Sequence, residues 1–265
     1  MSSLPETVAD LTAEGDDLEK LIASLSAAEW SLPTPAPGWT IAHQVAHLSF
    51  IFHLAATAAS DPEAFQVMME GAQKDFGGAV TAALAASLTG GPEEQFARWR
   101  AERAAASDAL AAAPPGDMVP WLVRPLPPVI LACAGIMELF GHGQDIFDAM
   151  AVQREYTDRI KHLVGFAILV WDFGYQSRGL TPPDQEFRFE LTAPSGELWA
   201  FGPDTAADKV TGPAVDFCLL VTRRRHRDDL ALIATGAEAD RWLDIAQAYR
   251  GPAGDGRTPG QFSGS

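Results

Sequence analysis

Two side chains that could bind a metal ion lie close together in the segment MELFGHGQDIFDAM, residues 137–150. Glu138 and His142 are four residues apart. On an α-helix this spacing places both side chains on one face, one turn from each other. A carboxylate and an imidazole in that arrangement supply two ligands to one divalent metal ion. The sequence therefore predicts part of a metal site, whose third ligand has to come from elsewhere in the fold.

The best candidate for the third ligand is His47, in the segment PGWTIAHQVAHL, residues 37–48. His43 lies four residues earlier, so both imidazoles can face one side of a helix. A histidine on an apolar helix face is more often a hydrogen-bonded core residue than a ligand, and spacing alone leaves both roles open. Glu138 favours the metal site, because a carboxylate in an apolar helix is costly to bury unless it is paired or bound to a metal.

Two histidines and one glutamate leave coordination positions open, which is typical of a catalytic zinc site rather than a closed structural one. Zinc is the first expectation, and the absence of cysteine ligands lets nickel and iron(II) fit as well. Such a metal acts as a Lewis acid or activates a bound water or thiol. Asp145, three residues after His142, either orients an imidazole or faces solvent, and the sequence leaves both readings open.

The composition narrows the classes of partner. The chain has 265 residues and a formal net charge of −16, from 35 acidic and 19 basic residues. This balance argues against nucleic-acid binding, which needs lysine and arginine to neutralise phosphates, and against docking on anionic membranes. No segment reaches the roughly 18 apolar residues of a membrane helix, and no signal peptide is visible. We expect a cytoplasmic protein with a small-molecule substrate, with neither nucleic acid nor membrane as partner, and a homodimer is left open.

Two further expectations concern single residues. Cys133 and Cys218 both lie in apolar runs, so free buried thiols are expected rather than a disulfide. In the segment EEQFARWRAERAAASDALAAA, residues 93–113, Trp99 is expected to face the protein interior and Arg103 to face water.

The first 150 residues carry apolar side chains at helical spacing. Thr40 can cap the second of these helices, and Gly77-Gly78 can interrupt the third. Helices are expected at residues 4–27, 41–60, 63–88, 93–113 and 129–150. The proline-rich segment 114–128 is expected to be a long loop of the kind that is often functional. This organisation predicts a helical bundle, and the core of such a bundle is a usual place for a metal site.

The character of the sequence changes near Tyr156. Alternating residues predict a β-hairpin with strands at 186–192 and 197–201 around a Pro-Ser-Gly turn. The remaining expectations are helices at 158–178, 210–221 and 237–249, a strand at 229–234, and a loose tail from residue 251. The fold class is thus α+β, with a helical bundle at residues 1–152 and a small α+β domain at residues 153–265.

Three segments together resemble the mycothiol-dependent maleylpyruvate isomerases and their DinB-like metal-binding relatives. They are PGWTIAHQVAHL, the Glu-x-x-x-His-x-x-Asp run at 138–145, and TGPAVDFCLLVTRRRHRDD followed by LIATGAEADRWLDIAQAYRGP. The resemblance covers nearly the whole chain in this order. It implies a DinB-like four-helix bundle in which His47, Glu138 and His142 form the metal triad, with His43 as a neighbour of the site.

The same resemblance implies a metal-dependent isomerase or thiol transferase that uses mycothiol on a small or biosynthetic carboxylate-bearing substrate. It implies that an arginine of the C-terminal domain binds the substrate carboxylate, for which Arg223 and Arg224 are the candidates. With His43 they form the expected catalytic set, although the arginine run also reads as a solvated basic patch. No mycothiol signature is visible. Two other functions stay open: a non-enzymatic protein that holds a metal or ligand in the same cleft, and a cyclase or lyase of a biosynthetic pathway.

Overall fold

A computed structural model describes residues 2–72, 76–114, 116–122, 124–252 and 254–262. The chain divides into two compact units, Met1–Val152 and Gln153–Ser265, and each is described by itself. Within the described residues, no helix combines the length and the hydrophobicity that crossing a membrane requires.

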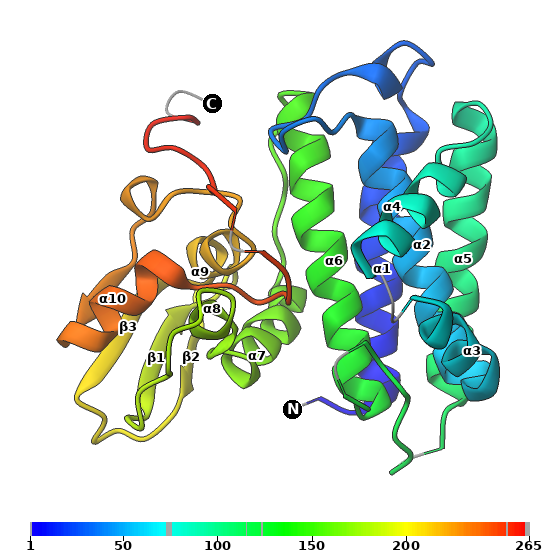
Figure 1. The fold of residues 1–265 in the computed structure, drawn as a ribbon. Helices are drawn as coiled ribbons and strands as arrows, with labels where there is room; N and C mark the ends of the chain where they lie inside the picture. The colour runs from blue at the N-terminus through cyan, green and yellow to red at the C-terminus, as the bar shows by residue number, and fades with distance from the viewer. Residues whose placement is uncertain (1, 73–75, 115, 123, 253, 263–265) are drawn as a thin grey trace. The chain divides into compact units, whose positions relative to one another are not determined.

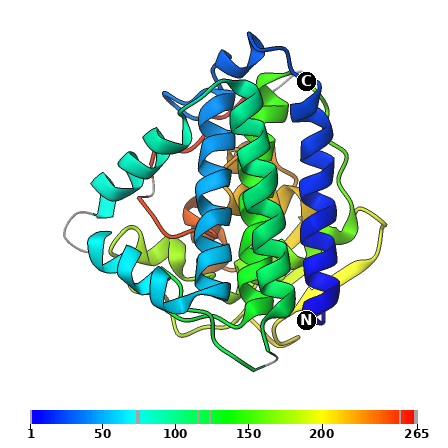
Figure 2. The same cartoon turned by 90° about the vertical axis from the view of Figure 1, so that its right-hand side faces the viewer.

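The N-terminal unit is built on four long helices that lie side by side (Figures 1 and 2). They are α1 (Leu4–Ala23), α2 (Ile41–Ser60), α5 (Pro92–Ala112) and α6 (Pro128–Ala149). Helices α1 and α2 each pack against both α5 and α6. Their facing sides bury apolar residues such as Leu11, Val45, Trp99 and Ile136, each of them 0% exposed. The expected four-helix bundle is therefore confirmed.

Two shorter helices, α3 (Pro62–Ala72) and α4 (Phe76–Ser87), accompany α2 (Figure 2). The single helix expected at 63–88 is present as these two helices, and Gly77-Gly78, named as a possible break, lie within α4, which begins at Phe76 and continues through both glycines. The alanine-rich segment that follows them has a high helix propensity, which offsets the cost of about 1 kcal/mol that a glycine brings to a helix. Residues 73–75, between the two helices, lie outside the described part of the chain.

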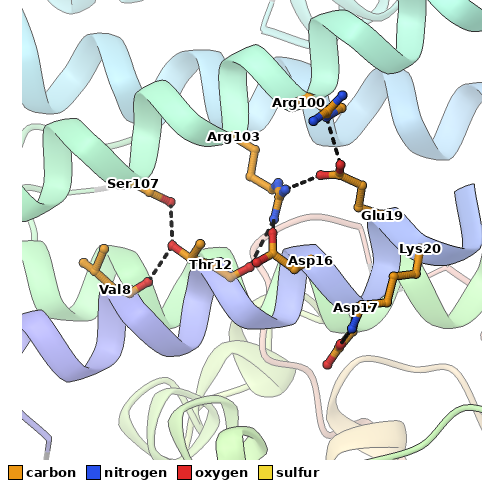
Figure 3. A network of polar contacts seen from close by, with 9 residues as sticks. All are labelled: Val8, Thr12, Asp16, Asp17, Glu19, Lys20, Arg100, Arg103 and Ser107. Atoms are coloured by element: carbon orange, nitrogen blue, oxygen red, sulfur yellow. Dashed lines mark hydrogen bonds and ion pairs between the residues drawn. The ribbon is translucent and has the colours of Figure 1, made fainter. Parts of the chain in front are cut away.

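Arg103 is buried between α1 and α5 instead of facing water. It is 8% exposed, and its guanidinium donates to the Asp16 carboxylate at 2.8 Å and to the Thr12 carbonyl at 3.1 Å. It also pairs with Glu19 (Figure 3). Gly15 makes room for this side chain, since a Cβ at that position would collide with the guanidinium. The expectation failed because three acceptors on α1, invisible in the local pattern of α5, satisfy the buried charge.

The C-terminal unit contains a four-stranded sheet in the order β2-β1-β3-β4. The strands are β1 (Phe187–Thr192), β2 (Leu198–Phe201), β3 (Asp208–Pro213) and β4 (Ile233–Thr235). The predicted hairpin is present as the antiparallel β1–β2 pair. Strand β3, expected as the start of a helix, instead pairs in parallel with β1 along its whole length. The local sequence pattern could not reveal β3, because its partner β1 lies in another segment of the chain. Val210 is also the only fully buried apolar side chain of β3.

The helices of this unit are shorter than expected. The α-helices are α7 (Lys161–Leu169), α8 (Phe173–Gln176), α9 (Ala214–Val221) and α10 (Ala237–Ile245). Two short 3-10 helices accompany them, η2 (Asp158–Ile160) and η3 (Arg227–Asp229). A single helix over 158–178 is wrong, because Val170 leaves the helical conformation with φ −115° and ψ 27°. The carbonyl of Trp171 then accepts a hydrogen bond from Trp242 Nε1 at 2.9 Å. Likewise, residues 229–232, expected to be part of a strand, precede β4.

The C-terminal tail is not loose where it is described. The backbone N–H of Gly260 donates to the Asp229 carboxylate at 2.8 Å, and Arg223 Nη2 donates to the Gly254 carbonyl at 3.3 Å. The guanidinium of Arg225 lies 3.7 Å from the centre of the Phe262 ring. Glycine- and proline-rich composition predicted flexibility, but these contacts hold residues 254–262 against the segment that follows α9.

Candidate metal centre

The three predicted ligands meet in the N-terminal unit. His47 comes from α2, and Glu138 and His142 come from one face of α6. Glu138 Oε2 lies 3.4 Å from His47 Nε2 and 3.3 Å from His142 Nε2, and the three ligand atoms all lie within 4.8 Å of one another. Two ligand atoms bound to a tetrahedral zinc ion are roughly 3.3 Å apart, given metal–ligand distances of about 2.0–2.1 Å. The donor set therefore fits a zinc-sized ion in both composition and spacing.

The cluster is largely shielded from solvent. The side chains of His47, Glu138 and His142 are 18%, 19% and 16% exposed. Burial raises the pKa of the Glu138 carboxyl, but hydrogen bonds from His142 and His47, together with their charge, outweigh burial and hold that pKa well below its usual range. The carboxylate is consequently ionised at neutral pH, which is the form that binds a metal.

A glutamine that the sequence analysis did not single out joins the site. Gln44, on α2, is 0% exposed, and its Oε1 lies 2.6 Å from His142 Nδ1. Its Nε2 donates to Asp145 Oδ2 at 3.2 Å and to Thr34 Oγ1 at 2.9 Å. Asp145 is 0% exposed, so the reading of it as a solvated residue is wrong, and it contacts the site through Gln44. The signal in the sequence that could have identified Gln44 is its polar amide, three residues before His47 in a largely apolar helix.

His43 lies outside the ligand cluster and belongs to the helix cap. Its Nδ1 accepts the backbone N–H of Thr40 at 3.2 Å and lies 2.8 Å from the Thr40 hydroxyl. Thr40 is the N-cap of α2, as expected, and His43 occupies the third helical position, where a glutamate or glutamine usually closes a capping box. The ring of His43 remains near the site through Trp39, with ring centroids 6.2 Å apart.

Trp39 covers the imidazoles of the cluster. Its ring stacks on His142 with centroids 5.9 Å apart and is tilted against His47 at 5.6 Å. The two imidazoles are themselves 4.2 Å apart. This half-buried indole gives the site an apolar aromatic wall, which lowers the local polarity and strengthens electrostatic interactions within it.

The two candidate arginines differ in their surroundings inside the C-terminal unit. Arg223 lines a cavity of about 110 Å³, whose other charged lining residues include Arg225, Arg257, Asp244 and Asp255. Arg223 also has a positive φ of 58°, at the point where α9 ends and its N–H donates to the Leu220 carbonyl at 2.8 Å. Arg224 Nη1 donates to the Thr222 carbonyl at 2.6 Å, and the described lining residues of the cavity do not include it.

Fold and site together define a class: a DinB-like four-helix bundle that carries a His-Glu-His cluster and is joined to a small α+β unit. Residues 11–147 match the family described as "Mycothiol maleylpyruvate isomerase N-terminal domain". That match spans more than half of the 265 residues, so the chain belongs to this family, as the sequence motifs predicted. In the C-terminal unit, residues 183–235 match a second family, described as "Wyosine base formation".

Comparisons with individual proteins identify relatives in sequence and in fold. Two uncharacterised proteins of Mycobacterium tuberculosis, from strains CDC 1551 / Oshkosh and ATCC 25618 / H37Rv, are each 42% identical over 250 residues, covering 94% of this chain and 97% of theirs. The crystal structures of the mycothiol-dependent maleylpyruvate isomerase and of a single-residue mutant of it match with TM-scores of 0.60 and 0.61. Both cover 88% of this chain and 93% of the solved one at 14% identity. At that identity the likeness shows a common fold.

Proposed function

We propose that this protein is a metal-dependent enzyme, an isomerase or thiol transferase, that acts with mycothiol on a small carboxylate-bearing molecule. The observation that carries the proposal is the convergence of His47, Glu138 and His142 in one shielded cluster. Its family, named for a mycothiol-dependent isomerase, supports the reaction class.

In this proposal each residue of the site has a separate role. His47, Glu138 and His142 would hold the ion, for which zinc is the best fit, and three protein ligands would leave at least one coordination position open. A divalent metal bound there supplies Lewis acidity and lowers the pKa of a coordinated water or thiol. Trp39 excludes water from one side of the imidazoles. His43 would donate or accept a proton only through Nε2, because its Nδ1 is engaged at the helix cap.

For the substrate carboxylate we propose Arg223 rather than Arg224. Arg223 lines the cavity of its unit, and a guanidinium can bind a carboxylate through two parallel hydrogen bonds. Its left-handed backbone is costly for a residue other than glycine, and such strain is often retained at functional sites. Arg224 donates to the Thr222 carbonyl, two residues earlier in the chain, and is not among the described lining residues of the cavity. The proposal also includes a cytoplasmic location, which the two free, buried cysteines support.

The test is turnover of a panel of small unsaturated carboxylates, including maleylpyruvate, with and without mycothiol, by the zinc-loaded protein. We expect turnover that requires the thiol and disappears in Glu138→Gln. Arg223→Lys should raise KM at least about tenfold with a smaller effect on kcat, because it removes the paired hydrogen bonds to the carboxylate. Arg224→Lys is the matched control and should stay within about twofold of the unaltered protein.

The contrary outcome is a zinc-loaded protein that converts no member of the panel at any thiol concentration. That outcome would favour the non-enzymatic alternative, in which the same cluster only holds a metal or ligand.

A further inference from the structure

The Gln44 side chain occupies a position in which all of its hydrogen-bonding groups are used. It is 0% exposed, between Thr34, Asp145 and His142. Its Oε1 faces His142 Nδ1 at 2.6 Å, while its Nε2 contacts Asp145 Oδ2 at 3.2 Å and Thr34 Oγ1 at 2.9 Å. Both N–H groups and the carbonyl of the amide therefore have partners, as buried polar groups require.

The partners of Gln44 fix the direction in which its amide points. The carboxylate of Asp145 accepts hydrogen bonds and does not donate them. The hydroxyl of Thr34 donates to the Trp39 carbonyl at 3.0 Å, which leaves its oxygen to accept. Both contacts therefore need an N–H from Gln44, and an exchange of its oxygen and nitrogen would place acceptor against acceptor. The amide oxygen must face His142.

The direction of the amide in turn determines the state of His142. Because Gln44 Oε1 can only accept, Nδ1 of His142 must carry a hydrogen. In the metal-free protein the other nitrogen donates to Glu138, and a metal ion bound there would replace that hydrogen and take the lone pair. That nitrogen, Nε2, is the one that lies 3.3 Å from Glu138 Oε2. The hydrogen-bond chain thus turns the metal-binding lone pair of His142 into the cluster.

We propose that Gln44 is a positioning residue of the metal site, held by Asp145 and Thr34, that fixes the Nδ1-protonated tautomer and ring orientation of His142. This inference rests on the proposed metal site. It assigns roles to three residues that bind no metal themselves, and it explains why a carboxylate, Asp145, is fully buried three residues after a ligand. Partners of this kind typically change metal affinity by about 10–100-fold when they are removed.

The first test measures the tautomer directly in the unaltered protein. In zinc-loaded protein with ¹⁵N-labelled histidine, long-range ¹H–¹⁵N correlation spectra distinguish a protonated from a metal-bound ring nitrogen. We expect Nδ1 of His142 to be protonated and Nε2 to be bound to zinc. Zinc bound to Nδ1 would overturn the inference, and this test needs no variant to fold.

The second test compares two buried glutamines of the N-terminal unit. Gln44→Leu removes the hydrogen-bond acceptor of His142, whereas Gln95→Leu removes an amide on α5 that donates to the Leu88 and Gly90 carbonyls at 3.1 and 3.0 Å. Zinc affinity is measured by competition with a chromogenic chelator, and folding by circular dichroism. We expect Gln44→Leu to weaken zinc binding by about 10–100-fold and Gln95→Leu to change it by less than about twofold.

The outcomes separate this inference from the proposed function. If the unaltered protein binds no zinc, both are wrong. If it binds zinc and folded Gln44→Leu binds equally well, only the role of Gln44 is wrong. Should Gln44→Leu fail to fold, the tautomer of His142 in the unaltered protein decides the question.

Discussion

Glu138 gives the cluster its negative charge, and its ionisation makes the stability of the folded protein decrease at low pH. Its pKa lies well below the ordinary value of 4.5. Above pH 4.5 the carboxylate is therefore charged in both the folded and the unfolded chain. In the metal-free protein, Glu138 contributes stability at neutral pH, and this contribution is lost as the pH falls below 4.5 towards its folded pKa.

Metal retention should depend on pH in a higher range than this stability. Glu138 stays ionised at mildly acidic pH, so the protons that compete with the metal bind the imidazole nitrogens. We expect bound metal to decrease while Glu138 is still ionised, above pH 4.5, measured by equilibrium dialysis and elemental analysis. Metal loss that begins only below pH 4.5 would show that the carboxylate, not the imidazoles, controls release.

Cys133 illustrates a residue whose chemistry is suppressed by its surroundings. Burial raises the pKa of its thiol to about 12, and the side chain is 5% exposed on α6. Since the thiolate is the reactive form, we expect negligible alkylation by iodoacetamide at pH 8 in the folded protein and complete alkylation in urea. Peptide mass spectrometry measures both. Rapid labelling of Cys133 in the folded protein would contradict this placement.

At the scale of elements, the helix that carries two of the three candidate ligands ends with a strained residue. Ala151 has a positive φ of 51°, and the N–H groups of Ala151 and Val152 donate to the Asp148 and Phe147 carbonyls at 3.2 and 3.0 Å. This hydrogen-bond pattern ends α6 in a Schellman motif, in which glycine is the usual residue at the left-handed position.

Ala151→Gly should therefore stabilise the protein by about 0.5–1 kcal/mol, because it removes the steric cost of the left-handed conformation. The same substitution at Ala104, an exposed residue within α5, should destabilise it by about 1 kcal/mol. Denaturant unfolding measures both changes. Equal effects of the two substitutions would mean that the end of α6 is not strained.

The packing of α1 against α5 depends on the guanidinium group of Arg103, which pairs with two carboxylates at once. Arg103→Lys keeps the charge but cannot bridge Asp16 and Glu19 in the same way, so a loss of about 1–2 kcal/mol is expected. The matched control is Arg100→Lys on the same helix, where a side chain 57% exposed makes one ion pair with Glu19, and its effect should stay within about 0.5 kcal/mol. Thermal unfolding of both variants tests the comparison.

Elements in which apolar residues repeat at helical spacing could be predicted from the sequence. Elements stabilised by contacts with distant segments could not. The helices that carry His47 and Glu138 were predicted within about a residue or two at each end, because buried apolar residues repeat along them. Strand β3 was missed because its partner β1 lies in another segment. The same limit applies to Arg103, whose partners are on α1, and to the tail, which is held by contacts to Arg223, Arg225 and Asp229.

For the molecule as a whole, the three candidate metal ligands could be predicted from their residue types and positions, but the residues that surround them could not. The spacing of Glu138 and His142 requires only that both lie on a helix, and the third ligand followed from a family resemblance. Gln44 was not predicted, because its role depends on hydrogen bonds to Thr34 and Asp145 that only the packing of α2 on α6 creates. All of these residues belong to the N-terminal unit, Met1–Val152, whereas Arg223 belongs to the other.

The central claim is that His47, Glu138 and His142 bind one divalent metal ion, and metal content tests it most directly. Protein prepared without an affinity tag, dialysed and analysed by inductively coupled plasma mass spectrometry, should contain close to one zinc per chain. Glu138→Gln should weaken zinc binding by more than the roughly 10–100-fold that is typical when a residue outside the ligand set is removed. Glu102→Gln should retain the metal, because that carboxylate pairs with His53 away from the cluster. Clearly substoichiometric metal in the unaltered protein, or unchanged metal content in Glu138→Gln, would contradict the account.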